Sequence, residues 1–519
     1  MATKNSFREI GIKTAKGGTV YIIGEGFTSF LSLIVIVYLA RMLQPSDFGL
    51  YIISIAFAFL LGMGGNFGIG TALRKKLPEA KNKAQSNRIM SNGYIIAGGI
   101  SIIIALLGII LSSSIANIIY HNSSLSTPIA IASASVFFSV LFNITMASLV
   151  GIGKVRISVY SNVLYSISQL IIIVILVSSG YGVLGAMTGY LLSLIIGLLF
   201  GAATLLRRGA FKLEHVSATI IKELSSFSLP VVISNIINIG ISNFGVVFLG
   251  VFVASAIVGN YGAASRIGNI VNIFVTSGTF LLLPAYAMVI SHKKHNQNIS
   301  SAYENSVYYT LLFLLPIVAF SIAGAQPLLK LLVSSKYSLA PIYFSIIAAG
   351  LTIGVIGTYA GSILIGFGRT KKFMKYQIYV AIVELGLLIA LTPIFNAYGV
   401  LFSVFIFGPI FSAIIYTRLL KREFLFNINY KRSTRLVASA TILFVLLSLT
   451  TYATMYNYYS LLLDIIVTII VYPIILIVFR GIGAKEISFI EETSKRMVVI
   501  NRFSSVFIKY IHRLFKFFG

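Results

Sequence analysis

The sequence predicts an all-α integral membrane protein with about 14 transmembrane helices, arranged as two six-helix lobes in a parallel internal repeat plus two extra C-terminal helices. Composition, apolar runs and an internal repeat lead to this prediction. Of the 519 residues, 57% are hydrophobic and only 10% are charged, whereas a soluble globular protein carries roughly 25% charged residues. So few charges cannot cover a surface that faces water, which excludes a soluble fold and predicts a protein surrounded by lipid.

Fourteen apolar runs are long enough to cross a membrane. A helix rises 1.5 Å per residue and the hydrocarbon core is ~30 Å thick, so a crossing needs about 20 residues. The longest run exceeds this length, which allows tilt, a kink at Pro284 or extension into the cytoplasm. The runs cover residues 17–42, 46–67, 91–119, 125–150, 159–178, 182–206, 228–253, 256–290, 305–324, 342–366, 373–392, 396–418, 436–455 and 459–479.

The distribution of basic residues orients these helices. With the N-terminus in the cytoplasm, nearly all of the 40 Lys and Arg residues fall in cytoplasmic segments, and only Lys330 and Lys336 fall in external ones. Cytoplasmic loops concentrate Lys and Arg, so both termini are expected in the cytoplasm of a multi-pass plasma-membrane protein. The net charge of +27 then indicates a face attracted to anionic membrane lipids, and it needs no nucleic acid as a partner.

An internal repeat divides the chain. Gly49, Gly151-Ile-Gly153 and Tyr181-Gly182 recur as Gly259, Gly366-Phe-Gly368 and Tyr398-Gly399, between 210 and 217 residues later. An even number of helices in each copy gives both the same orientation, and in such parallel repeats the substrate site lies between the halves. The predicted parts are an N-lobe (1–206), a cytoplasmic linker (207–227), a C-lobe (228–420), helices 13 and 14 (421–479) and a basic amphipathic cytoplasmic tail (480–519).

Two motifs resemble a known group of transporters. Residues 39–51 (LARMLQPSDFGLY) followed by 68–73 (GIGTAL) resemble the opening of polysaccharide-biosynthesis flippases, of the oligosaccharide or O-antigen type, in the multidrug/oligosaccharidyl-lipid/polysaccharide (MOP) exporter superfamily. Residues 259–266 (GNYGAASR) with 282–284 (LLP) are similar to the eighth helix of that superfamily. The resemblance spans residues 17 to about 420.

The resemblance implies transport and no enzymatic activity. Such a flippase would move a polyprenyl-(di)phosphate-linked oligosaccharide from the cytoplasmic to the outer leaflet by alternating access, for cell-surface polysaccharide or glycan assembly. The implied partners are the lipid-linked oligosaccharide and, with no specific support in the sequence, glycan-assembly enzymes.

A phosphate and a sugar head require a polar cavity that contains a cation, and Arg266 is the candidate. Its planar guanidinium suits phosphate oxygens, and an Arg at the helix centre costs ~2.5–3.5 kcal/mol on insertion scales. Glu25 is predicted at a similar depth in the first helix, so the two side chains could meet. One interpretation is a permanent pair that holds the lobes together. The favoured interpretation releases Arg266 to the phosphate when Glu25 is protonated or finds another partner.

Other polar residues inside the predicted membrane helices are candidates for ion coupling or sugar binding. Glu384 corresponds through the repeat to Gln169, so the same site is polar in both copies. This carboxyl could bind a proton or Na⁺, or it could stay protonated and hydrogen-bonded within its lobe; no other cofactor and no metal are expected. Amides that could bind sugar hydroxyls, or else join helices, are Asn235, Asn238, Asn243, Asn269 and Asn272.

Two rival functions follow from the same residues. A membrane enzyme acting outside would need acid, base or nucleophile residues on an external loop, but the longest external stretch, 325–341, has no carboxylate and no His. A cation-coupled multidrug exporter of the same superfamily is the stronger rival. Its cationic substrates need an acidic cavity, and that branch usually has twelve helices. The sign of charge in the cavity would separate the two functions.

Overall fold

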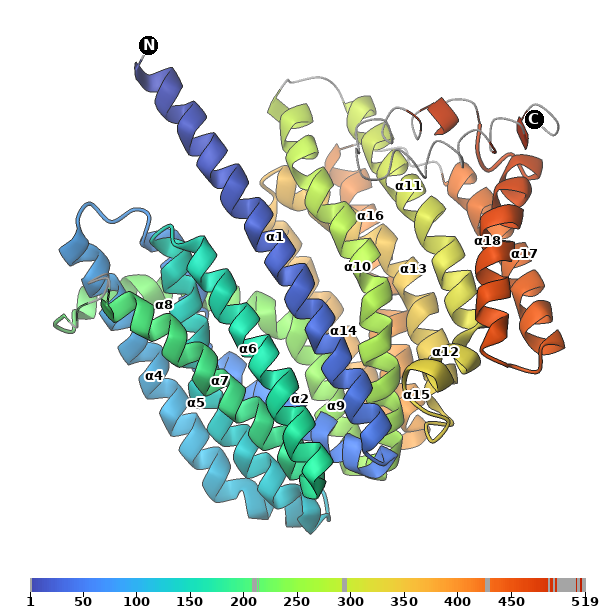
Figure 1. Cartoon of the computed structure of the whole chain (residues 1–519). Helices are drawn as coiled ribbons and strands as arrows, with labels where there is room; N and C mark the ends of the chain where they lie inside the picture. Colours follow the sequence, from blue (N-terminus) through green and yellow to red (C-terminus); the bar gives the residue numbers. More distant parts are fainter. Residues whose placement is uncertain are drawn as a thin grey trace. The chain divides into compact units, whose positions relative to one another are not determined.

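The computed structural model describes residues 2–207, 212, 214–291, 296–424 and 430–483, together with 486–488, 491, 510, 514 and 515. Across these residues the regular structure is helical, with no β-strand, which confirms the all-α prediction (Figure 1). The first half of the chain contains α1 (Ala2–Met42), α2 (Pro45–Asn66), α3 (Ile69–Lys76), α4 (Lys83–Ser114), α5 (Ser126–Gly151), α6 (Val155–Leu176), α7 (Gly182–Arg207), α8 (Ala218–Asn235) and α9 (Ile241–Phe252).

The second half continues with longer helices and a final hairpin. Its helices are α10 (Ser255–Ser291), α11 (Asn296–Ala323), α12 (Ala325–Leu332), α13 (Ala340–Gly366), α14 (Thr370–Phe395), α15 (Ala397–Leu401), α16 (Gly408–Phe424), α17 (Lys431–Ala453) and α18 (Tyr459–Val478). Turns of π-helix occupy Ile115–Ile119, Val177–Tyr181, Ile236–Gly240 and Phe402–Phe407, and a short 3₁₀ turn covers Ser123–Leu125.

Each of the fourteen predicted runs coincides with a helical stretch. The short helices α3 and α12 were not predicted, and α8 begins inside the predicted linker. Among the described residues, eleven stretches are long and apolar enough to cross a membrane, which makes this a multi-pass membrane protein. One of these stretches, Val155–Arg207, contains both α6 and α7. The number fourteen and the boundaries of the lobes stay predictions.

One pair of turns has the same geometry in both predicted copies. Gly153 after α5 and Gly368 after α13 both have positive φ, at 76° and 71°. The next residue in each turn donates its N–H back into the preceding helix, from Lys154 to Leu149 O at 2.7 Å and from Arg369 to Leu364 O at 2.9 Å. This is a glycine-terminated helix end of the Schellman type. The two turns agree with the predicted repeat, which as a whole stays a prediction.

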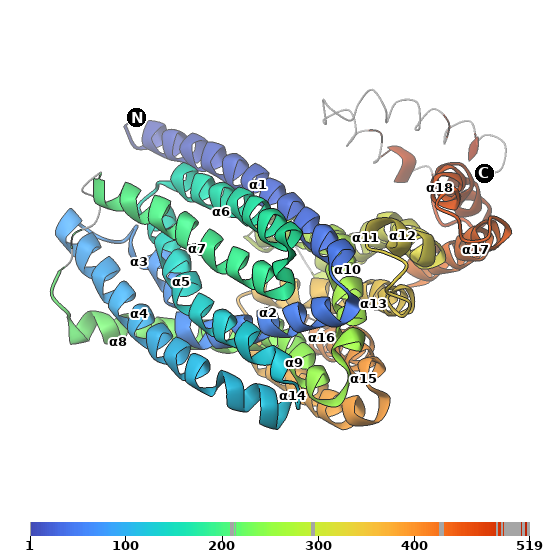
Figure 2. The ribbon, with the colours of Figure 1, turned by 60° about the horizontal axis from the view of Figure 1, so that its bottom comes forward.

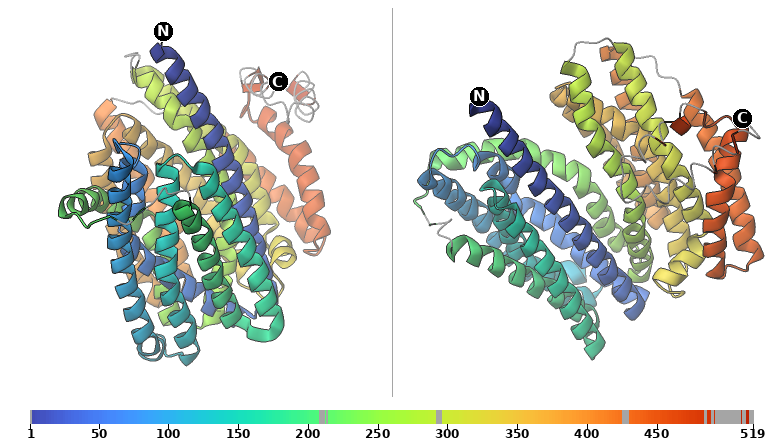
Figure 3. Two further views of the ribbon diagram at one scale, coloured as in Figure 1. Left: turned by 60° about the vertical axis from the view of Figure 1, so that its left-hand side comes forward. Right: turned by 45° about the horizontal axis from the view of Figure 1, so that its top comes forward.

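The chain forms two compact units, each described by itself. The first comprises Met1–Ala263 with Leu388–Val400, and the second comprises Ala264–Leu387 with Leu401–Gly519. In the first unit α1 packs on α6, α6 on α7 and α4 on α5, as Figure 2 shows. In the second, α11 packs on α13 and α17, and α17 and α18 run side by side (Figure 3).

Two glycines bring α2 and the first turns of α10 into backbone contact within the first unit. A Cβ on Gly49 would lie 1.8 Å from the carbonyl oxygen of Ser255, and a Cβ on Gly259 would lie 2.0 Å from that of Pro45. Gly49 and Gly259 are the pair that the sequence identifies as repeat-related. Helices that must approach this closely need small residues at the contact.

The segment before α8 is attached to α4. Ser91 is buried and accepts a hydrogen bond from Glu214 N at 3.0 Å, while its own hydroxyl donates to Lys212 O at 3.3 Å. Asn92, also buried, accepts from Ser217 N at 2.9 Å. This part of the predicted linker therefore lies on the surface of the N-terminal helices.

Candidate functional site

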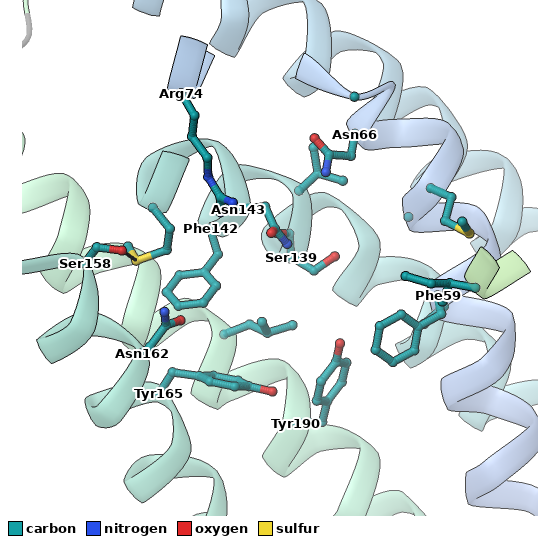
Figure 4. Close-up of a pocket in the computed structure, with 18 of the residues that line it drawn as sticks. Phe59, Asn66, Arg74, Ser139, Phe142, Asn143, Ser158, Asn162, Tyr165 and Tyr190 are labelled. Atoms are coloured by element: carbon teal, nitrogen blue, oxygen red, sulfur yellow. Dashed lines mark hydrogen bonds between the residues drawn. The ribbon is translucent and has the colours of Figure 1, made fainter. Parts of the chain in front are cut away.

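A cavity of about 480 Å³ lies within the first compact unit (Figure 4). Helices α1, α2, α3, α5, α6, α7 and α8 contribute to its wall, so it forms inside one unit and needs no residue from the other. Its lining is mixed, with one carboxylate, one guanidinium, several neutral polar groups and apolar side chains. The polar residues are Tyr21, Glu25, Asn66, Arg74, Ser139, Asn143, Ser158, Asn162, Tyr165 and Tyr190.

A break between α2 and α3 brings Arg74 to this cavity. Phe67 and Gly68 have left-handed backbone conformations, with φ of 41° and 66°, which end α2 and start α3 in a new direction. Asn66 accepts a hydrogen bond from the Gly70 N–H at 3.4 Å, which satisfies a free donor at the start of α3. A Cβ at position 68 would lie 2.9 Å from Ser228 O, so both the φ angle and the packing favour glycine. In Figure 4, Arg74 extends toward Asn143.

The two cations that follow Arg74 are bound elsewhere. Lys75 lies over the ring of Phe227, 4.4 Å from its centre. Lys76 pairs with Glu79 at 3.2 Å and with Glu223 of α8 at 2.5 Å, and the hydrogen bond from Lys76 to Glu223 raises the pKa of Lys76 above its usual 10.5. The Lys76 ammonium is therefore charged at neutral pH, and its ion pair is lost as the pH rises through that raised pKa.

Within the described part of the chain, Arg74 makes no ion pair and no hydrogen bond of its own. Glu25 projects from α1 into the same cavity, and Tyr21, one helical turn earlier, interacts with its carboxylate and lies near Arg74. The cavity thus holds one positive and one negative group. The sequence prediction included Glu25 but placed Arg74 among the basic residues of a cytoplasmic segment. The positive φ at Gly68, which starts α3 in the direction that brings Arg74 to the cavity, was not predicted.

Amide and hydroxyl groups line the remaining wall. Asn143 of α5 donates to Ser139 O of its own helix at 3.1 Å, which leaves its carbonyl oxygen and second N–H toward the cavity. Figure 4 shows Asn162, Tyr165 and Tyr190 from α6 and α7 around the same space. These residues were not predicted from the sequence, because single amides and tyrosines are common in membrane helices.

The other predicted site residues lie in several places. Gln169 is buried on α6, one turn from Tyr165, with which it interacts. Asn243 donates to Ile239 O of the preceding turn at 2.9 Å. On α10, Arg266 and Asn272 are half-buried and Asn269 is exposed. The side chains of Asn235 and Asn238 lie outside the described residues. Glu25 and Arg266 belong to different compact units, so their predicted meeting stays a prediction.

Glu384 occupies a restricted position in the second unit. It is half-buried on α14, and its carboxyl has no hydrogen-bond or ion-pair partner among the described residues. The π-helical turn Phe402–Phe407 ends next to it at Gly408, which donates its N–H to Ser403 O. A Cβ on Gly408 would lie 2.9 Å from the Glu384 carboxyl. Single π-helical turns are frequent at functional sites, and this one leaves space for the carboxyl.

The Lys76–Glu223 pair should hold α3, and with it Arg74, in position. We expect Lys76→Glu and Glu223→Lys each to lower the rate of transport, because each variant places like charges together and so displaces α3 and Arg74. The loss should not exceed about fivefold, which is the size expected of an exposed ion pair. The double variant restores opposite charges and should recover most of the activity. Activity in the double variant as low as in the single ones would contradict the assignment.

Comparisons with known proteins agree with this architecture. The profile of the family described as "Polysaccharide biosynthesis protein" matches residues 14–290. A structure of the lipid II flippase MurJ, in an inward closed conformation, is 17% identical with a TM-score of 0.72, and the match covers 89% of this chain and 98% of that one.

An inward-facing multidrug resistance transporter of the MATE family in the MOP superfamily is 15% identical with a TM-score of 0.64, over 77% of this chain and 94% of that one. No curated protein matches by sequence. At these identities the structural matches establish the MOP-type fold alone, while the profile covers more than half of the sequence. The chain belongs to the polysaccharide biosynthesis protein family.

Proposed function

We propose that the protein translocates a polyprenyl-(di)phosphate-linked oligosaccharide from the cytoplasmic to the outer leaflet by alternating access, as a transporter and not as an enzyme. The observation that supports this most is Arg74 in a cavity whose other polar groups are mainly amides and hydroxyls. An unpaired guanidinium offers two parallel N–H donors to phosphate oxygens. The amides can both donate to and accept from sugar hydroxyls.

The size of the cavity fits part of such a substrate. Its volume of about 480 Å³ lies within the range of ~300–1,000 Å³ typical of small-molecule sites. It can therefore hold a phosphate and the first sugars, whereas the polyprenyl chain would stay in the lipid. Phe59, Met63 and Phe142 give the cavity an apolar part next to the polar one.

Topology and partners complete the proposal. The basic residues would place both termini in the cytoplasm of a plasma-membrane protein, with anionic lipids at the cytoplasmic face. The translocated lipid-linked oligosaccharide would then be available to glycan-assembly enzymes in the outer leaflet. The fold is compatible with such a role in cell-surface polysaccharide assembly.

Glu25 favours a second candidate function, cation-coupled multidrug export. A carboxylate in the cavity could bind an organic cation, and Arg74 opposes this by placing a positive charge in the same space. The two functions predict different substrates for the same purified protein.

The test compares both substrates in proteoliposomes. Protein reconstituted with a fluorescent polyprenyl-diphosphate oligosaccharide should move it across the bilayer faster than empty liposomes do, while a cationic dye should not be transported. Dye transport with no movement of the lipid-linked sugar, across several head groups, would replace the flippase proposal with the exporter.

Coupling to a proton or Na⁺ gradient is assigned to Glu384 in this proposal. Glu384→Gln keeps the shape and removes the titratable group, so we expect transport to lose its dependence on a proton or Na⁺ gradient while substrate binding is retained. Glu79→Gln removes an exposed carboxylate that pairs with Lys76; it is the matched control and should retain the gradient dependence of the original protein. A gradient dependence that persists in Glu384→Gln would exclude this residue as the coupling site.

A further inference from the structure

The turn between α17 and α18 gathers exposed aromatic side chains. Between residues 452 and 459 there are four tyrosines and one methionine, and Met455 is the most exposed of them at 88%. The rings form two neighbouring pairs, Tyr452 with Tyr456 and Tyr458 with Tyr459, whose centres are 6.4 Å and 4.6 Å apart. The turn contains no charged residue, whereas the opposite ends of the same helices carry Lys431, Arg432, Arg435 and Arg480.

The backbone of this turn is held in an unfavourable conformation. Met455 and Tyr456 have φ of 52° and 55°, a left-handed conformation that favours glycine at the end of a helix. The Tyr456 N–H donates to Thr451 O at 3.0 Å and the Met455 N–H donates to Tyr452 O at 3.0 Å, which is the Schellman arrangement. Glycine would adopt this backbone conformation at a lower free-energy cost than Met455 and Tyr456 do. The presence of large side chains at these two positions therefore indicates that the side chains have a function.

A buried carboxylate fixes the base of the turn. Asp464 of α18 has no exposed surface. Thr451 of α17 donates to one of its oxygens at 2.9 Å, and Thr450 donates to the other. Both oxygens are therefore satisfied across the two helices, which ties α17 to α18 immediately below the tyrosines.

Helix length places the turn at the edge of the hydrocarbon layer. Helix α17 has 23 residues and α18 has 20, and at 1.5 Å per residue each spans roughly the ~30 Å of the hydrocarbon core. With the basic ends on one side of the membrane, the turn reaches the boundary on the other side. Tyrosine is suited to this layer, because its ring is apolar and its hydroxyl is polar.

We infer that the α17–α18 turn is an interfacial anchor whose tyrosines bind the phospholipid head-group layer on the side opposite the basic helix ends. The Asp464 contacts order the turn, and the left-handed residues direct Met455 and Tyr456 outward. The anchor fixes the depth of the hairpin in the bilayer. This inference does not depend on the proposed substrate.

The absence of Trp from the sequence makes the test direct. Full-length Tyr459→Trp, Leu463→Trp and Ile470→Trp each carry a single tryptophan, excited selectively over tyrosine, on one exposed face of α18. From the first position to the second and third, the depth increases by about 6 Å and about 16 Å. In liposomes of brominated lipids, the indole of Tyr459→Trp should be quenched most by bromine near the head groups. The indole of Ile470→Trp should be quenched most by bromine deep in the acyl chains.

Quenching from the aqueous phase would contradict the interfacial anchor. If aqueous iodide quenched the Tyr459→Trp protein as it quenches free tryptophan, with no effect of brominated lipid, the anchor would be overturned. Such a result would place the turn in water, outside the head-group layer.

A second measurement tests whether the tyrosines determine the depth of the hairpin in the bilayer. In the Leu463→Trp protein, changing Tyr452, Tyr456, Tyr458 and Tyr459 together to Ser removes the rings and leaves the Asp464 contacts in place. We expect the depth at which bromine quenches most strongly to change. An unchanged depth profile would show that the tyrosines do not hold the hairpin at the interface.

Discussion

Arg74→Ala is expected to lower the rate of lipid-linked oligosaccharide translocation by about 10- to 100-fold, which corresponds to the ~1.5–3 kcal/mol of a hydrogen bond to a charged group. Arg74 contributes a guanidinium to a cavity in which, among the described lining residues, no other Lys or Arg is present. Its loss would leave the carboxylate of Glu25 as the charged group of the cavity, and that charge repels phosphate. The assay is transbilayer movement of a polyprenyl-diphosphate oligosaccharide in proteoliposomes.

Two further variants define what Arg74 contributes. Arg74→Lys keeps the charge but loses the planar donor pair, so it should fall between the original protein and Arg74→Ala. Arg156→Ala is the matched control, because Arg156 is exposed in the first turn of α6 and does not line the cavity. Equal rates for Arg74→Ala and Arg156→Ala would show that the phosphate is bound elsewhere. Arg266→Ala in the same assay tests the cation that the sequence predicted.

Gly49→Ala is expected to reduce the amount of folded protein severely. The added methyl carbon would lie 1.8 Å from the Ser255 carbonyl oxygen, and since that atom belongs to the backbone, no side-chain rotation can relieve the overlap. Overpacking in a close-packed interior costs typically ~1–3 kcal/mol and occasionally more, and we expect the upper end here. Gly259→Ala should behave in the same way because its Cβ meets Pro45 O at 2.0 Å.

The measurement is thermal stability in detergent, followed by the fraction of monodisperse protein after heating. Gly26→Ala and Gly99→Ala are matched controls, because both glycines lie in helices where an added Cβ meets nothing within 4 Å. They should be neutral or slightly stabilising, since Ala favours helix over Gly by about 1 kcal/mol. If Gly49→Ala were as stable as Gly26→Ala, the contact between α2 and α10 would have to be looser than these distances indicate.

The sequence was most informative about helices in lipid. An apolar run of about 20 residues has few alternatives in a bilayer, because every backbone N–H and C=O must be satisfied within the segment. The predicted runs therefore coincide with helical stretches from α1 to α18. The same argument does not identify a π-helical turn, because one extra residue per turn leaves the average hydropathy unchanged.

The cavity was harder to predict, for a physical reason. Glu25 was found because a lone carboxylate inside an apolar run is costly and conspicuous. Arg74 was not, because it lies among basic residues at the end of a run, and its direction depends on the φ angles of Phe67 and Gly68. Asn143 and Asn162 reach the cavity only through the packing of α5, α6 and α7. Which residues face one another is a property of tertiary packing, and hydropathy does not encode it.

The attachment of residues 212–217 to α4 has a consequence for synthesis of the protein in the cell. Ser91 and Asn92 are present in the nascent chain more than a hundred residues before their partners. Since chains emerge from the ribosome N-terminal part first, α4 is made and inserted before α8 and can receive the linker as soon as it appears. The second half of the chain would thus begin its insertion from a point already held by the first half, which gives the two halves a fixed order of biogenesis.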